Sequence, residues 1–120
     1  MKKILIAEDD KPMARTMRIK LAKSGFDVTV AVDGEEALEF LSKDKFDLIL
    51  LDIMMPKVNG FKVLEEMKNR GDNTPVVVTS NLSQSSDKSK VMELGARDYF
   101  VKSNTSIFDI VDHVKGILNI

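Results

Sequence analysis

The sequence contains no cysteine and a single histidine, His113. The absence of cysteine excludes disulfide bonds, thiolate metal sites and cysteine nucleophiles. A lone imidazole also excludes a metal site built from several histidines. We expect His113, close to Asp109 and Asp112 on the last predicted helix, to be a surface residue with no catalytic part.

The sequence also lacks an excess of charge and a long apolar run. Eighteen Lys and Arg against nineteen Asp and Glu give a formal net charge of -1, whereas binding to nucleic acid or an anionic membrane requires a basic excess. The longest apolar runs, such as residues 48–51, are far too short for a membrane span or a signal peptide. We therefore expect a cytoplasmic protein with no direct nucleic-acid contact and no membrane insertion.

The length of 120 residues, with 43% hydrophobic and 31% charged residues, predicts one globular domain over residues 1–120. Short apolar segments alternate with patterns of helical periodicity. The predicted strands are residues 4–7, 28–31, 48–51, 76–79 and 99–101. Three of them are apolar at nearly every position, which favours a parallel sheet covered by helices on both faces. The pattern predicts an α/β fold, doubly wound, with five βα units.

Local signals place the helices between these strands. Asp33 is expected to cap the second helix, with Glu36 in a capping-box position, and Asp10 to cap the first. The fourth predicted helix is polar over residues 85–90, so we expect it to be loosely anchored. Four methionines are expected to fill the core. They are Met13, Met17, Met67 and Met92.

Polar side chains follow four of the predicted strands. Glu8, Asp9 and Asp10 follow the first strand, Asp52 follows the third, Thr79 and Ser80 end the fourth, and Lys102 follows the fifth. In an open parallel sheet the carboxyl ends of the strands meet at one edge, where ligands bind.

Clustered carboxylates repel one another unless a cation lies among them, and oxygen ligands of this kind suit Mg²⁺. The set lacks the residues of an acyl-transfer triad. It suits an aspartyl phosphate on Asp52, with Lys102 and Ser80 holding the phosphoryl oxygens.

Short motifs spread along the whole chain resemble the receiver domain of bacterial two-component response regulators, including chemotaxis regulators. They are the segments at residues 4–10, 51–56, 59–60, 93–99 and 101–102. The resemblance implies a flavodoxin-like (βα)5 sandwich with strand order 2-1-3-4-5. It also implies Mg²⁺-dependent phosphoryl transfer from a histidine kinase or phosphotransfer protein. Such a domain catalyses its own phosphorylation and dephosphorylation and turns over no separate substrate.

The resemblance assigns roles to the matching residues. Asp52 corresponds to the phosphoacceptor, which also binds the metal, and Lys102 to the lysine beside it. Asp9 corresponds to a direct Mg²⁺ ligand and Glu8 to a ligand acting through water. The backbone carbonyl of Met54 corresponds to the third protein ligand.

The resemblance also implies a switch, in which a hydroxyl and the aromatic Tyr99 respond to phosphorylation. Ser80 precedes Lys102 by 22 residues, the spacing of the family, so we assign the hydroxyl to Ser80 and keep Thr79 as the alternative. The face formed by the fourth helix, fifth strand and fifth helix is then expected to bind a downstream protein target.

Several positions depart from the family pattern or border the site. Ser103 replaces a proline that usually follows the lysine, which puts the geometry of that bond in question. Asn81 replaces a small residue, and we expect its larger side chain to narrow access to the phosphoryl site. Met54 and Leu82 border the approach of water to the phosphoryl group, and both are apolar, so we expect slow hydrolysis.

Other functions fit the sequence less well. A flavodoxin-like electron carrier would share the fold, but the acids at residues 8–10 would repel a flavin phosphate. A haloacid-dehalogenase-type phosphatase would carry its nucleophile after the first strand. A non-signalling pseudo-receiver or an engineered receiver-like scaffold stays open as the alternative, as does the choice between a stand-alone receiver and a fragment of a longer regulator.

Overall fold

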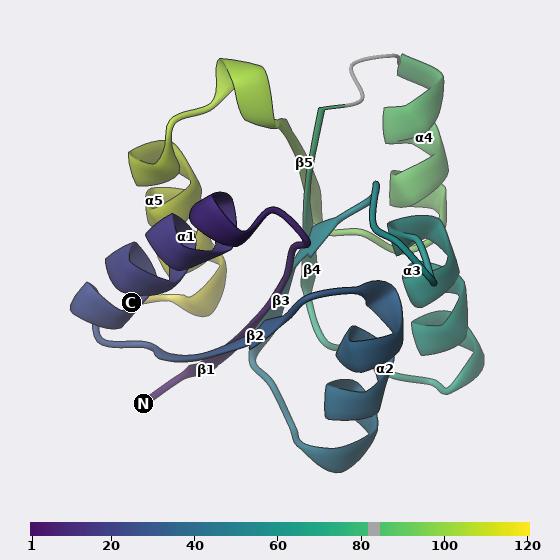
Figure 1. Ribbon diagram of the computed structural model, residues 1–120, viewed down its shortest axis with the longest axis horizontal. Helices are drawn as coiled ribbons and strands as arrows, with labels where there is room; N and C mark the ends of the chain where they lie inside the picture. The colour runs from purple at the N-terminus through teal and green to yellow at the C-terminus, as the bar shows by residue number, and fades with distance from the viewer. Residues whose placement is uncertain (82–84) are drawn as a thin grey trace.

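The computed structural model describes residues 1–81 and 85–120, which alternate between strands and helices (Figure 1). The strands are β1 (Lys3–Ala7), β2 (Asp27–Ala31), β3 (Leu48–Asp52), β4 (Val76–Ser80) and β5 (Asp98–Val101). The helices are α1 (Lys11–Lys23), α2 (Gly34–Lys43), α3 (Gly60–Asn69), α4 (Ser85–Glu93) and α5 (Ile107–Leu118), with a 3₁₀ turn η1 (Lys102–Asn104) after β5. In the described part of the chain, no helix has the length and apolar character needed to cross a membrane.

The five strands form one parallel sheet in the order β2-β1-β3-β4-β5. Helices α1 and α5 cover one face, and α2, α3 and α4 cover the other (Figure 1). The predicted doubly wound fold and the strand order implied by the resemblance are both confirmed.

The core consists of two apolar clusters, one on each face of the sheet. Successive side chains of a strand point to opposite faces, so Leu5 and Ala7 pack under α2, α3 and α4 while Ile4 and Ile6 pack under α1 and α5. All five residues of β3 are buried, as expected for a central strand covered on both sides.

Side-chain caps fix where the helices begin. The carboxylate of Asp33 accepts a hydrogen bond from Glu36 N at 2.8 Å, and Asp10 caps α1 in the same way through Met13 N at 3.4 Å. The Glu36 carboxylate accepts from Val32 N rather than from the cap residue itself. The predicted caps of α1 and α2 are therefore confirmed.

Helix α4 has few apolar anchors among its described side chains. Among residues 87–93, Val91 is buried and the others are partly or fully exposed. Met92 is 40% exposed and is absent from the core cluster that Val91 joins, so the expectation that it fills the core is wrong. Met17 and Met67 do lie in the core, 2% and 3% exposed.

The register of the strands brings their carboxyl ends to one edge. Ala7 pairs with Leu51, Asp52 with Thr79, and Ser80 with Val101. Glu8 therefore emerges beside the end of β3, and Lys102, which follows β5 on the far side of β4, reaches Asp52 with its side chain.

Candidate functional site

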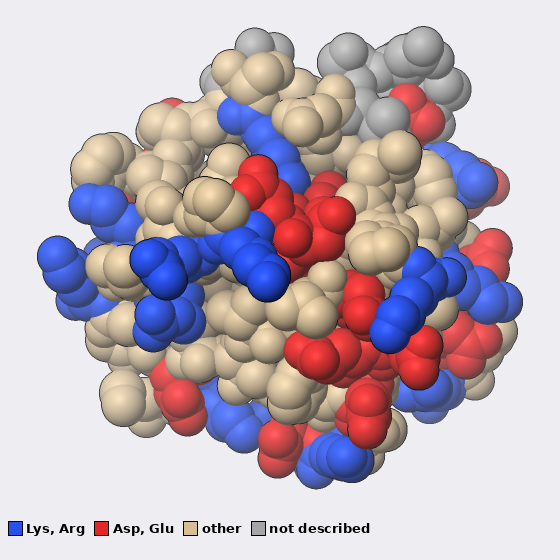
Figure 2. All heavy atoms as spheres, in the orientation of Figure 1, with Lys and Arg blue, Asp and Glu red and all other residues tan. Residues whose placement is uncertain are grey.

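Three carboxylates meet at the carboxyl edge of the sheet. Each of Glu8, Asp9 and Asp52 offers an oxygen atom, and these atoms lie within 4.8 Å of one another. Glu8 and Asp52 are buried, 1% and 4% exposed, whereas Asp9 faces solvent. Acidic side chains gather in the middle of the molecular face shown in Figure 2, with basic side chains beside them.

The side chain of Lys102 joins this cluster from the end of β5. Its ammonium donates a hydrogen bond to the Glu8 carboxylate and lies 3.2 Å from Asp52 Oδ2. One cation therefore serves two buried carboxylates, and the acidic cluster keeps an excess of negative charge.

The burial of these groups shifts their ionisation. Burial, followed by the hydrogen bond with Asp52 and the charge of that residue, raises the pKa of Glu8 to about 7. Burial alone would lower the pKa of Lys102, but the hydrogen bond to Glu8 and the charge of Asp52 raise it above its ordinary value. Lys102 is thus held as a cation, while the raised pKa of Glu8 favours its protonated form.

The cluster fits a hard divalent cation. All of its donor atoms are carboxylate oxygens, the ligands that Mg²⁺ prefers. Burial, followed by the neighbouring Asp52 carboxylate, raises the pKa of Glu8, and a cation among the oxygens would favour its charged form.

The two candidate hydroxyls at the end of β4 lie on opposite faces of the sheet. Thr79 lines a pocket of about 390 Å³ between α1 and α5, together with Lys102 and Met13. Ser80 is fully buried on the other face and is hydrogen-bonded to Tyr99, which is 8% exposed and packs in the cluster under α2, α3 and α4. Ser80 and Tyr99 are therefore in contact, while Thr79 faces away from that pair.

The environment of Tyr99 links it to α4 as well. Burial, followed by the charge of Asp87 on α4, raises the pKa of the Tyr99 hydroxyl, and the hydrogen bond with Ser80 lowers it. The Tyr99 hydroxyl therefore interacts both with Ser80 at the end of β4 and with Asp87 on α4.

The loop after β3 carries Met54 beside the site. Met54 N donates a hydrogen bond to Asp52 Oδ1 at 3.3 Å, and the Met54 side chain is exposed. Asn81 is exposed at the end of β4, and Leu82 lies outside the described residues. No peptide bond in the described chain is cis, so the bond between Lys102 and Ser103 is trans, and η1 begins there.

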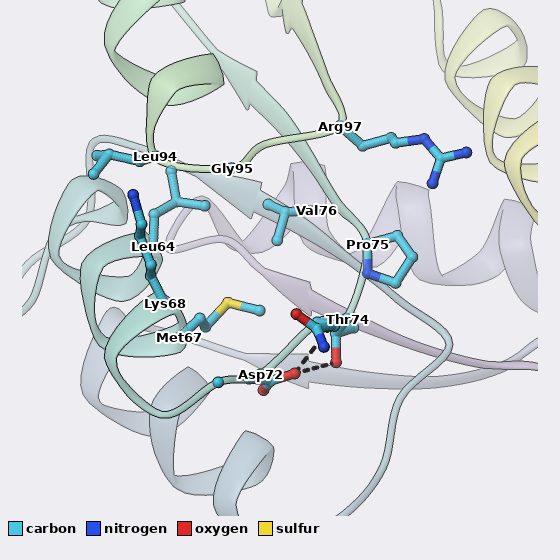
Figure 3. Close-up of a pocket in the computed structure, with 12 residues that line it drawn as sticks. Leu64, Met67, Lys68, Asp72, Thr74, Pro75, Val76, Leu94, Gly95 and Arg97 are labelled. Carbon is cyan, nitrogen blue, oxygen red and sulfur yellow. Dashed lines mark hydrogen bonds between the residues drawn. The ribbon is translucent and has the colours of Figure 1, made fainter.

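A second hollow, of about 290 Å³, lies at the opposite edge of the sheet between α3 and α4 (Figure 3). Leu64, Met67 and Val76 point into it, and Arg97 extends away from it. Its carboxylate, Asp72, accepts hydrogen bonds from the backbone and hydroxyl of Thr74, at 3.0 and 2.6 Å. Asp72 is the single acid among its lining residues, and no residue of the acidic cluster lines it.

A comparison with protein families matches residues 4–115 to the model described as "Response regulator receiver domain". The chain belongs to the response regulator receiver family. The receiver domain of a Francisella response regulator, at 34% identity, superposes with a TM-score of 0.94 over 99% of this chain and 98% of that one. The response regulator TrrA from Thermotoga maritima, solved in complex with Mg²⁺ and BeF, gives a TM-score of 0.85 at 27% identity, over 98% of this chain and 99% of that one.

Curated relatives of this receiver are longer proteins. The transcriptional regulatory protein DltR of Streptococcus agalactiae is 39% identical over 83% of this chain and 45% of its own length. The alkaline phosphatase synthesis transcriptional regulatory protein PhoP of Bacillus subtilis is 38% identical over 98% of this chain and 48% of its own length. The receiver spans about half the length of these relatives. Because they are named transcriptional regulators, the expectation of no nucleic-acid contact finds no support here.

Two features of this receiver were not anticipated from its sequence. The ion pair between Glu8 and Lys102 joins residues far apart in the chain, and no local sequence pattern predicts it. His113 on α5 pairs with the Asp98 carboxylate and packs edge-on against Phe100, with ring centroids 4.8 Å apart. His113 thus ties α5 to β5, on a surface away from the acidic cluster.

Proposed function

We propose that this receiver accepts a phosphoryl group on Asp52 from a histidine kinase or phosphotransfer protein, with Mg²⁺ held by Asp9, Asp52, the Met54 carbonyl and, through water, Glu8. The observation that carries the proposal is the position of Lys102 Nζ, 3.2 Å from Asp52 Oδ2 within a cluster of three carboxylates. The family works in the cytoplasm, and we place this protein there.

The chemistry follows from the positions of these side chains. An oxygen of Asp52 bonds to phosphorus while the bond from phosphorus to the donor atom breaks, and the donor leaves with that electron pair. Lys102 offers hydrogen bonds and positive charge to the phosphoryl oxygens as negative charge develops there. Bound Mg²⁺ would neutralise further charge on those oxygens.

The response to phosphorylation runs through Ser80 and Tyr99. A phosphoryl group on Asp52 offers Ser80 a new, charged hydrogen-bond acceptor at the end of the neighbouring strand. Ser80 and Tyr99 are hydrogen-bonded, and Tyr99 faces α4, in which Val91 is the one buried residue among residues 87–93. A change at Ser80 therefore shifts the face formed by α4, β5 and α5, where the downstream protein binds.

Acetyl phosphate, a small phosphoryl donor, tests this proposal without a kinase. The intact mass of the protein is measured after incubation with acetyl phosphate, with Mg²⁺ or with a chelator. We expect the gain of one phosphoryl group in Mg²⁺ alone, no gain for Asp52→Asn, and an undiminished gain for the control Asp112→Asn, on the exposed face of α5.

The same mass measurement distinguishes the proposed function from the alternative, a receiver fold that does not signal. A non-signalling pseudo-receiver would bind Mg²⁺ and gain no phosphoryl group at any donor concentration. A gain that persists in the Asp52→Asn variant would contradict the assignment of the acceptor.

A further inference from the structure

The β3–α3 loop, residues 53–59, is tied directly to the phosphorylation site. Gly60 N donates a hydrogen bond to Ile53 O at 2.8 Å, which closes the base of the loop. At its start, Met54 N donates to Asp52 Oδ1 at 3.3 Å. A displacement of this loop would therefore move the Met54 carbonyl and the Asp52 carboxylate together.

The outer side of the loop lies against the amino terminus of α2. A Cβ atom at Gly34 would lie 1.9 Å from Val58 O and 2.7 Å from the Val58 carbonyl carbon. Cβ atoms essentially never approach non-bonded atoms this closely, and the obstacle is backbone rather than a flexible side chain. Gly34 is therefore required by close approach, since any side chain there must push the loop and the helix apart.

An ion pair holds the same loop from the side. Asp33 Oδ2 lies 3.7 Å from Lys57 Nζ, while Asp33 Oδ1 caps α2 by accepting from Glu36 N at 2.8 Å. Lys57 has a φ of 66°, in the left-handed region that residues other than glycine rarely adopt. A strained backbone of this kind persists where its surroundings hold it, and Asp33 and Gly34 are among the residues that contact this loop.

We propose that Asp33 and Gly34 are positioning residues that clamp the β3–α3 loop, so that the Met54 carbonyl and Asp52 are presented together to Mg²⁺. We call these contacts the α2 clamp. The inference rests on the proposed function, because it requires Mg²⁺ at the acidic cluster. Substitution of residues that orient metal ligands without touching the metal commonly weakens metal affinity by about 10–100-fold.

The first test is a calorimetric titration of the full chain with Mg²⁺. We expect Gly34→Ala to weaken Mg²⁺ binding about 10-fold or more and to speed amide exchange in residues 53–59. The matched control is Gly116→Ala, because Gly116 also lies in a helix and a Cβ there would meet nothing within 4 Å. Gly116→Ala should bind Mg²⁺ as the wild type does.

The second test keeps the proposal falsifiable if Gly34→Ala does not fold. Asp33→Asn retains an oxygen to cap α2, and Lys57→Asn tolerates the left-handed backbone, so each removes the ion pair alone. We expect each to weaken Mg²⁺ binding about 2–5-fold, as a partly exposed pair allows. The double variant should bind no more weakly than either single variant.

The outcomes distinguish the clamp from the metal site itself. If Asp9→Asn weakens Mg²⁺ binding while folded Gly34→Ala binds as the wild type does, the clamp is wrong and the metal site stands. Additive losses from Asp33→Asn and Lys57→Asn would also overturn the clamp. If Asp9→Asn and the wild type bind Mg²⁺ equally, the proposed metal site is wrong and the clamp falls with it.

Discussion

Glu8 and Lys102 are separated by 94 residues in the sequence and form an ion pair inside the acidic site. The side chains are 1% and 11% exposed, and Asp52 adds a second carboxylate 3.2 Å from the same ammonium. Two buried carboxylates therefore share one cation. Protons, and in the proposed function Mg²⁺ and a phosphoryl group, would all act on this one charge balance.

Without a divalent cation, the free energy of unfolding should rise as the pH falls from about 8 to about 5. The pKa of Glu8 is raised from 4.5 to about 7 in the folded chain, so the folded state takes up a proton in this window before the unfolded state does. We expect a gain of about 1–3 kcal/mol, measured by urea unfolding with a chelator present. Glu8→Gln is the control and should lose the gain; a wild-type stability that is flat or falls over this range would contradict the assignment.

Replacing Lys102 by methionine should destabilise the metal-free chain at pH 8 by about 2–4 kcal/mol, because two buried carboxylates lose their cation. The loss should shrink near pH 5, where Glu8 is protonated. The control is Lys43→Met, since Lys43 forms an exposed pair with Glu39 at 3.3 Å and should change stability by less than about 0.5 kcal/mol. Equal losses in the two variants would show that Lys102 is not a structural counter-ion.

The sequence predicts the parts of this molecule that depend on neighbouring residues. The strands follow from short apolar runs, and the caps at Asp10 and Asp33 follow from their position just before a helical pattern. The meeting of Asp52 with Lys102 follows from one topological rule, that parallel strands end at a common edge. These features need no knowledge of side-chain conformation.

Features that depend on the conformation of side chains or on close approach were not predictable. The Glu8 side chain turns inward to Lys102, although its neighbour Asp9 is exposed, and the two look alike in the sequence. Gly34 looks like an ordinary glycine after a cap, and its contact with Val58 arises from the packing of two distant segments. Met92 was misplaced because the short apolar pattern of α4 does not define which side of the helix is buried.

Removal of the Ser80 hydroxyl should uncouple phosphorylation from the output face. With Mg²⁺ and beryllofluoride as a phosphoryl mimic, we expect amide exchange to change in α4 and β5 of the wild type and of Thr79→Val. The change should be lost in Ser80→Ala, because Ser80 contacts Tyr99 and Thr79 faces the opposite side of the sheet. If the response were lost in Thr79→Val and kept in Ser80→Ala, the switch hydroxyl would be assigned to Thr79 instead.

The lifetime of the phosphoryl group should depend on Met54. Its backbone is hydrogen-bonded to Asp52, and its exposed, apolar side chain cannot orient an attacking water by hydrogen bonding. Met54→Asn should speed loss of phosphate about 10-fold, which corresponds to about 1.4 kcal/mol in the barrier. Met92→Asn, at an exposed methionine on α4, is the control and should leave the rate unchanged. Equal rates in Met54→Asn and the wild type would rule out apolar shielding by Met54.

Direct mapping of the phosphorylated residue tests the central claim, that Asp52 is the acceptor. An acyl phosphate on aspartate is reduced by borohydride to homoserine, which marks the residue in a peptide mass spectrum. After incubation with acetyl phosphate and Mg²⁺, the account predicts homoserine at position 52 and at no other acidic residue. Homoserine at position 9, or an altered residue at any position other than 52, would contradict it.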